Sequence, residues 1–175
     1  MVFDFDRAGI CSFTGHRDLS AEKREALRPL LYRTLRNLAL DRGFSVFLAG
    51  GAVGFDRMAA EEVLSLRRRY GGIRLYLLLP FPGYDAKWPA SERKALEELL
   101  EEADGRLYVS DAYGPGVYHA RDRMLVNLSS VCVSYLEKTS GGTYYTVSYA
   151  KDAGVEVIPL AKLLREGYND SGAGR

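Results

Sequence analysis

Residues 46–60 read Val-Phe-Leu-Ala-Gly-Gly-Ala-Val-Gly-Phe-Asp-Arg-Met-Ala-Ala, and this stretch decides the fold. Its first four residues, Val46–Ala49, are all apolar, which is typical of a strand buried on both faces of a parallel sheet. Glycines follow at positions 50, 51 and 54, and the chain then enters a helical pattern that continues to Tyr70. A buried strand that passes through a glycine turn directly into a helix predicts an α/β protein.

The same alternation of apolar runs and helical patterns extends along the chain on both sides of this stretch. The further strands that we expect cover residues 10–14, 74–79, 106–109, 131–136 and 155–159. The helices that we expect cover residues 20–41, with Ser20 as N-cap, 56–70, 89–103, 117–128 and 143–152. Pro29 lies inside the first helix and predicts a kink or a break there. The sequence thus predicts one Rossmann-like, doubly wound α/β domain over residues 1–168, with a mainly parallel sheet and helices on both faces, and a flexible tail over 169–175.

Composition excludes several classes of protein. The chain has 175 residues, and its 24 Lys and Arg nearly balance its 23 Asp and Glu, which gives no overall electrostatic reason to bind nucleic acid or an anionic membrane. No apolar run approaches the roughly 18–20 residues of a membrane span, and the acidic start is unlike a signal peptide, so we expect a cytoplasmic protein with no membrane partner. Cys11 and Cys132 lie in apolar runs and are interpreted as buried thiols. The two histidines share no ligand spacing with carboxylates, so we expect no metal and no cofactor.

Ligands of doubly wound sheets bind beyond the carboxyl ends of the strands, so the residues that follow strands are the candidate ligand-binding residues. They are Thr14, Gly15, His16 and Arg17, then Gly50, Gly51, Ala52, Gly54 and Asp56, then Pro80, Phe81 and Trp88, and finally Ser140, Gly141, Gly142, Thr143 and Thr146. Two of these turns are rich in glycine and enter helices, whose free N–H groups bind phosphate or another anion. The spacing matches neither a P-loop nor a clean dinucleotide fingerprint.

Charged and aromatic residues near these turns have alternative interpretations. Arg17 and Arg121 could supply fixed cations, whereas Arg121 and Arg123 lie two residues apart on a helix and should point in different directions. His16 either contacts ligand or stabilises its own turn, and Asp56 either contacts ligand or caps its helix. The aromatic side chains of Phe81 and Trp88 either stack on a base or anchor a hydrophobic loop.

Together these motifs resemble the YpsA/YoqJ-like proteins of the SLOG superfamily, the Rossmann-like group that also holds the DNA-uptake protein DprA and the cytokinin-activating LOG enzymes. The stretches that carry the resemblance are residues 13–17, 50–56 with 59–61, 80–81, 87–89, 121–123 and 140–143 with 145–146. The resemblance implies a nucleotide-type ligand held over the sheet by the two glycine turns. It also implies a homodimer or higher homo-oligomer, of a kind found in bacteria and their prophages.

Three functions follow from this resemblance. The first is binding of a nucleotide or nucleotide-derived small molecule, such as an ADP-ribose-like signal, by a sensor or sequestering module. The second is a LOG-like N-glycosidase that acts on nucleoside phosphates, with Arg121, Glu61 and Asp56 as candidate catalytic residues. The glutamate of the LOG enzymes is missing, since Val147 and Ser148 stand where acidic residues would be. The third is single-stranded nucleic-acid binding as in DprA, which the near-neutral charge disfavours.

Overall fold

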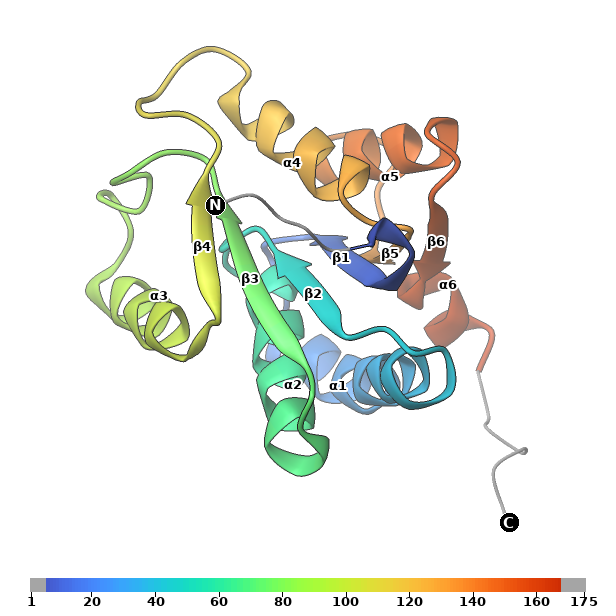
Figure 1. Cartoon of the computed structure of the whole chain (residues 1–175). Coiled ribbons are helices and arrows are strands. Elements are labelled where there is room, and N and C mark those ends of the chain that lie inside the picture. The colour runs from blue at the N-terminus through green and yellow to red at the C-terminus, as the bar shows by residue number, and fades with distance from the viewer. Residues whose placement is uncertain (1–5, 168–175) are drawn as a thin grey trace.

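Six parallel strands form the centre of the molecule, in the order β4-β3-β2-β1-β5-β6 (Figure 1). The computed structural model describes residues 6–167, so the expected tail at 169–175 lies outside the described residues. The strands are β1 Ile10–Gly15, β2 Val46–Ala49, β3 Arg74–Leu79, β4 Gly105–Tyr108, β5 Val131–Tyr135 and β6 Glu156–Pro159. Chain order runs outward from β1 to β4 on one side and resumes with β5 on the other side of β1. The predicted doubly wound α/β fold is therefore confirmed, with its switch point between β1 and β5.

Helices cover both faces of the sheet, as predicted (Figure 1). One face packs against α1 Ala21–Arg36, α2 Phe55–Tyr70, α3 Ala90–Glu102 and α6 Leu160–Arg165. The other face packs against α4 Val117–Asn127 and α5 Gly142–Asp152. The one-turn helix η1 Arg7–Gly9 precedes β1. The short helix α6, which follows Pro159, was not expected from the sequence.

The first helix begins where the sequence predicted and passes through its proline. The Ser20 hydroxyl accepts a hydrogen bond from the amide of Lys23 at 3.2 Å and is the N-cap. The helix α1 then continues through Pro29 to Arg36, so the expected break does not occur. Buried leucines on either side of the proline, Leu27 and Leu30, pack against the core and outweigh the single backbone hydrogen bond that proline removes. A π-helical segment, η2 Asn37–Asp41, directly follows α1.

The two cysteines are buried on opposite faces of the sheet. Cys11 belongs to the cluster under α1 and α2, and Cys132 belongs to the cluster under α4 and α5. Burial raises the pKa of both thiols, that of Cys132 to about 12. The prediction of buried thiols is confirmed. Among residues 6–167, no helix is long and apolar enough to cross a membrane.

Candidate functional site

A cavity of about 340 Å³ opens at the carboxyl edge of the sheet, over β1 and beside its switch point. Small-molecule pockets span roughly 300–1,000 Å³, so this cavity is at the small end of that range. Its walls come from the ends of β1 and β2, from α4 and from the start of α5. The lining residues are Phe13, Thr14, Gly15, His16, Arg17, Gly50, Ala52, Asp56, Tyr118, His119, Arg121, Asp122, Leu125, Gly142 and Thr143.

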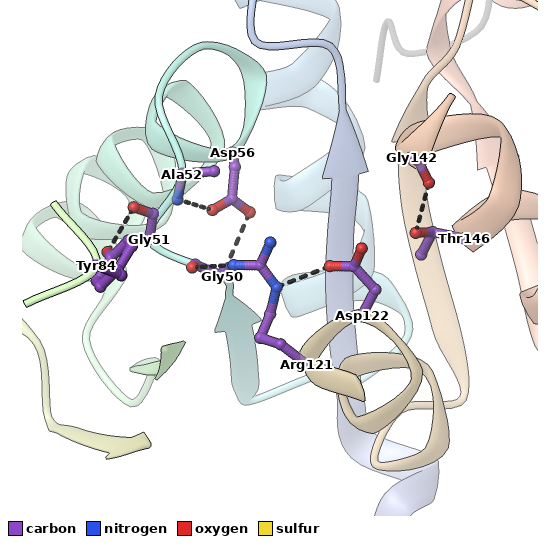
Figure 2. Close-up of polar contacts among 9 residues, drawn as sticks. All are labelled: Gly50, Gly51, Ala52, Asp56, Tyr84, Arg121, Asp122, Gly142 and Thr146. Carbon is purple, nitrogen blue, oxygen red and sulfur yellow. Dashed lines mark hydrogen bonds and ion pairs between the residues drawn. The ribbon is translucent and has the colours of Figure 1, made fainter. Parts of the chain in front are cut away.

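The glycine turn after β2 is closed by its own carboxylate (Figure 2). Asp56 accepts hydrogen bonds from the amide of Gly50 at 3.1 Å and from that of Ala52 at 2.9 Å, one on each carboxylate oxygen. On the other side, the Tyr84 hydroxyl donates to the Gly51 carbonyl oxygen at 2.7 Å. Two backbone N–H groups of this turn, those of Gly50 and Ala52, are thus already paired with a carboxylate. Asp56 holds the turn and does not cap the helix, since Gly54 is the N-cap of α2.

Burial and hydrogen bonding shift the pKa of Asp56 in opposite directions. The residue is 6% exposed, and burial raises the pKa of its carboxyl. The charge of Arg121 and the two amide hydrogen bonds oppose that rise. Asp56 lines the cavity, but each of its carboxylate oxygens already accepts a hydrogen bond from a backbone amide.

Glycine is required at this turn for close packing of protein against protein. A Cβ on Gly54 would lie 2.3 Å from the carbonyl oxygen of Arg17, and the residue has a φ of +82°. A Cβ on Gly50 would lie 2.8 Å from a guanidinium nitrogen of Arg121. These glycines therefore let the β1 loop and α4 approach the turn and form the cavity walls.

Arg121 lines the cavity, and Figure 2 shows its contacts with Gly50 and Asp122. It is 6% exposed, and it donates from Nη1 to the Gly50 carbonyl oxygen at 2.5 Å and from Nε to Asp122 Oδ1 at 2.7 Å. Its remaining nitrogen, Nη2, has no hydrogen-bond partner among residues 6–167. Arg123 instead donates to the Tyr145 hydroxyl at 2.9 Å and is not part of the cavity wall, so the two arginines do point in different directions.

The glycine turn before α5 is open, in contrast to the turn before α2. Gly141 is the N-cap of α5 with a φ of +92°, and no side chain caps the helix. Gly142 and Thr143, the first residues of the helix, line the cavity. The Thr146 hydroxyl donates back to the Gly142 carbonyl oxygen at 2.9 Å and lies outside the lining (Figure 2). Within residues 6–167 the first-turn amides of α5 therefore have no capping partner, and they lie with the positive end of the helix dipole beside lining residues Gly142 and Thr143.

The loop after β1 forms the opposite wall. His16 Nε2 accepts a hydrogen bond from the amide of Glu137 at 2.8 Å, so His16 stabilises the junction of two loops while its side chain also lines the cavity. Burial lowers the pKa of this imidazole, and the nearby charge of Lys138 lowers it further. Arg17 is exposed, and its guanidinium lies 6.0 Å from the ring centre of Tyr118.

Some residues predicted for the site lie outside the cavity lining. They are Gly51, Gly54, Glu61, Pro80, Phe81, Trp88, Ser140, Gly141 and Thr146. Glu61 is exposed and lies 3.5 Å from Arg28, with which it forms an ion pair on the surface. The rings of Phe81 and Trp88 both pack edge-on against Tyr84, as expected of an anchored loop. Phe81 reaches the cavity wall only through Tyr118, at 6.1 Å between ring centres.

Four lining residues of α4 were not predicted: Tyr118, His119, Asp122 and Leu125. Positions 118, 122 and 125 recur with the spacing of one face of a helix, and Arg121 lies on the same face. Because Arg121 was predicted as a site residue, this spacing could have indicated that Tyr118, Asp122 and Leu125 lie on the same side of the helix. That this side faces the cavity depends on the position of α4 over β1, which the sequence does not give.

Comparison with protein families identifies relatives of this chain. The model of the YspA SLOG family (YpsA) matches residues 13–157, which confirms the resemblance drawn from the motifs. UPF0398 protein OB1025 of Oceanobacillus iheyensis is 29% identical over 61% of this chain and 59% of its own length. UPF0398 protein BH1768 of Halalkalibacterium halodurans is 30% identical over 64% of this chain and 61% of its own. The SPbeta prophage-derived protein YoqJ of Bacillus subtilis is 24% identical over 60% of this chain and 68% of its own. The matched region thus spans about three-fifths of the first two relatives.

Two solved structures share the fold. DNA processing protein A from Helicobacter pylori, described for its single-stranded DNA binding mode, covers 92% of this chain and 74% of its own, with a TM-score of 0.60 and 17% identity. DNA processing protein A from Streptococcus pneumoniae covers 89% of this chain and 60% of its own, with a TM-score of 0.51 and 13% identity. At these identities the likeness shows a common fold.

Proposed function

Because this chain belongs to the YspA SLOG family, we propose that it binds a phosphorylated, nucleotide-derived small molecule at the carboxyl edge of its sheet. An ADP-ribose-like signal is one ligand of that class. One observation carries the proposal: Arg121, whose Nη2 group has no partner among residues 6–167, lines the same cavity as Gly142 and Thr143 of the uncapped first turn of α5. A fixed guanidinium edge and free helix amides together form a receptor for a phosphate group.

The phosphate is assigned to the α5 turn and not to the α2 turn. At the α2 turn, Asp56 already occupies the amides of Gly50 and Ala52, and its negative charge would repel a second anion. At the α5 turn, Thr143 offers a hydroxyl beside the unpaired amides. The α2 turn then supports the ligand indirectly, because its Gly50 carbonyl oxygen orients Arg121.

The charge of the cavity favours a small ligand over a polymer. The lining holds two arginines, Arg17 and Arg121, and two aspartates, Asp56 and Asp122, so the formal charges cancel. A nucleic-acid strand needs a row of cations along its phosphates, and its binding weakens steeply with salt. Because the chain shares its fold with DNA processing protein A, nucleic-acid binding is included in the test below.

Catalysis is not part of the proposal. Of the carboxylates considered for a LOG-like reaction, Glu61 lies outside the cavity, and both oxygens of Asp56 are engaged by backbone amides. Neither of these two carboxylates is therefore free to face a sugar on which positive charge develops, as a glycosidase requires. The homo-oligomeric state and cytoplasmic location stay predictions from the sequence and its resemblance.

Calorimetric titration with adenosine 5′-monophosphate, ADP-ribose and a single-stranded oligonucleotide tests the proposal. We expect binding of at least one nucleotide and loss of that binding in Gly142→Val. A Cβ at Gly142 meets no atom within 4 Å and its φ is outside the left-handed region, so we expect the valine to be accommodated while its bulk blocks approach to the backbone at a residue that lines the cavity.

The matched control is Gly9→Val, at the amino end of β1, where a Cβ also meets no atom within 4 Å. This variant should bind as the parent protein does. Unchanged affinity in Gly142→Val would move the site elsewhere. Binding of the oligonucleotide alone, with affinity that falls steeply with salt, would replace the small-molecule proposal with nucleic-acid binding.

A further inference from the structure

Asp122 places a carboxylate in the wall of a cavity that otherwise suits an anion (Figure 2). Its side chain is 17% exposed, and Oδ1 accepts from Nε of Arg121 at 2.7 Å. Its second oxygen, Oδ2, has no hydrogen-bond partner within residues 6–167. Of the two aspartates in the lining, Asp56 has both oxygens paired, whereas Asp122 has one available.

Orientation of Arg121 alone does not require a carboxylate here. One acceptor oxygen holds the Nε group, and the Gly50 carbonyl oxygen fixes Nη1 independently. A second negative oxygen near the phosphate position weakens phosphate binding unless a hydrogen-bond donor of the ligand covers it. The available oxygen therefore matches a ligand that carries donors close to its phosphate.

Sugar hydroxyls are the donors that lie closest to the phosphate in a nucleotide. The side chains of Arg121 and Asp122 contact each other through Nε and Oδ1 at 2.7 Å and line the same cavity, so the sugar next to a phosphate on Arg121 lies within reach of Asp122. An ionised carboxylate accepts hydrogen bonds from hydroxyls more strongly than a neutral group does. We infer that Asp122 is a specificity-determining residue that accepts a hydrogen bond from a ribose hydroxyl, so the cavity selects ribonucleotides over deoxyribonucleotides. This inference rests on the proposed function.

The test is calorimetric titration with adenosine 5′-monophosphate and its 2′-deoxy and 3′-deoxy analogues. The parent protein should bind at least one deoxy analogue about tenfold or more weakly, as expected for loss of a hydrogen bond to a charged group. In Asp122→Asn that preference should shrink to within about twofold, because the charged acceptor is gone while an amide oxygen can still hold Nε of Arg121. Asp122→Ser should behave in the same way and provides a second variant should the first fail to fold.

Asp152→Asn is the charge-matched control. Asp152 is exposed at the far end of α5, so its neutralisation should leave the preference unchanged. Equal binding of the three nucleotides by the parent protein would overturn this inference and leave the proposed function standing. A preference that survives in Asp122→Asn would also overturn it, since Asp122 would then only orient Arg121. If none of the three binds but ADP-ribose does, the inference is overturned and the proposed function stands; failure of ADP-ribose as well overturns both.

Discussion

Replacement of Asp56 by alanine should destabilise the protein, because this carboxylate holds the turn after β2. The side chain accepts from two backbone amides, those of Gly50 and Ala52, and the first of these residues is itself buried. In Asp56→Ala both N–H groups lose their acceptor, and no other side chain of residues 6–167 bonds to either. An orphaned buried donor costs about 1–3 kcal/mol, and a partly exposed donor such as that of Ala52 costs less because water reaches it.

The net loss is smaller than the sum of these costs, because alanine also removes a buried charge. Burial raises the pKa of Asp56, so its ionised form already carries a desolvation penalty. We expect a decrease of about 2–3 kcal/mol in the free energy of unfolding, which in a domain of this size lowers Tm by roughly 5–10 °C. Asp56→Asn should lose nearly as much, since one amide would face the NH₂ group of asparagine instead of an oxygen.

Urea unfolding followed by fluorescence of Trp88, the single tryptophan, measures the change. Trp88 packs on Tyr84, which is bonded to Gly51, so the probe lies beside the perturbed turn. The control is Asp152→Ala, an exposed acid whose removal should change the free energy of unfolding by less than about 0.5 kcal/mol. If Asp56→Ala or Asp56→Asn is as stable as the control, the carboxylate does not hold the turn, and its amides become available for a ligand.

Two further predictions concern the β1 loop. Burial lowers the pKa of His16 in the folded protein below its ordinary value of 6.5, and protonation of Nε2 removes the acceptor for the Glu137 amide. The contribution of His16 to the free energy of unfolding should therefore be constant above pH 6.5. It should decrease as the pH falls from 6.5 through the pKa of the folded state. Urea midpoints at about pH 8 and about pH 5.5 check this fall, and an equal fall in His16→Gln would refute it. Gly15→Ala should lower the free energy of unfolding by about 1–3 kcal/mol, because the added Cβ would lie 2.3 Å from the ring of Phe55. In the same unfolding assay, Gly142→Ala should leave the free energy of unfolding unchanged or raise it slightly, because its Cβ meets no atom within 4 Å.

The fold could be predicted because its signals are local. Each strand is a short apolar run, each glycine turn directly follows one, and the N-cap at Ser20 is set by its own sequence. The helix Leu160–Arg165 was missed because six residues are too few for a 3.6-residue period to show. Of the kink or break expected at Pro29, the break does not occur, because tertiary packing of flanking leucines decides whether a helix continues through proline.

The candidate site was predictable only where it follows strands. The turn residues around Gly15, Gly50 and Gly142 line the cavity as the parallel sheet requires. Tyr118 and Asp122 reach the cavity through the placement of a whole helix, which depends on long-range packing. Trp88 had the right position in the sequence, but its contacts with Tyr84 turn it toward the loop.

The most consequential difference lies between two turns that look alike in sequence. Each has a glycine N-cap with positive φ, Gly54 before α2 and Gly141 before α5. The second helical residue separates them: it is Asp56 in α2 and Thr143 in α5. An aspartate there reaches back and fills its own turn with a carboxylate, whereas a threonine is neutral and leaves the amides unpaired. One turn thereby holds its own backbone and orients Arg121 through the Gly50 carbonyl oxygen, and the other is the turn at which we propose that an anion binds, so a count of glycines cannot distinguish the two.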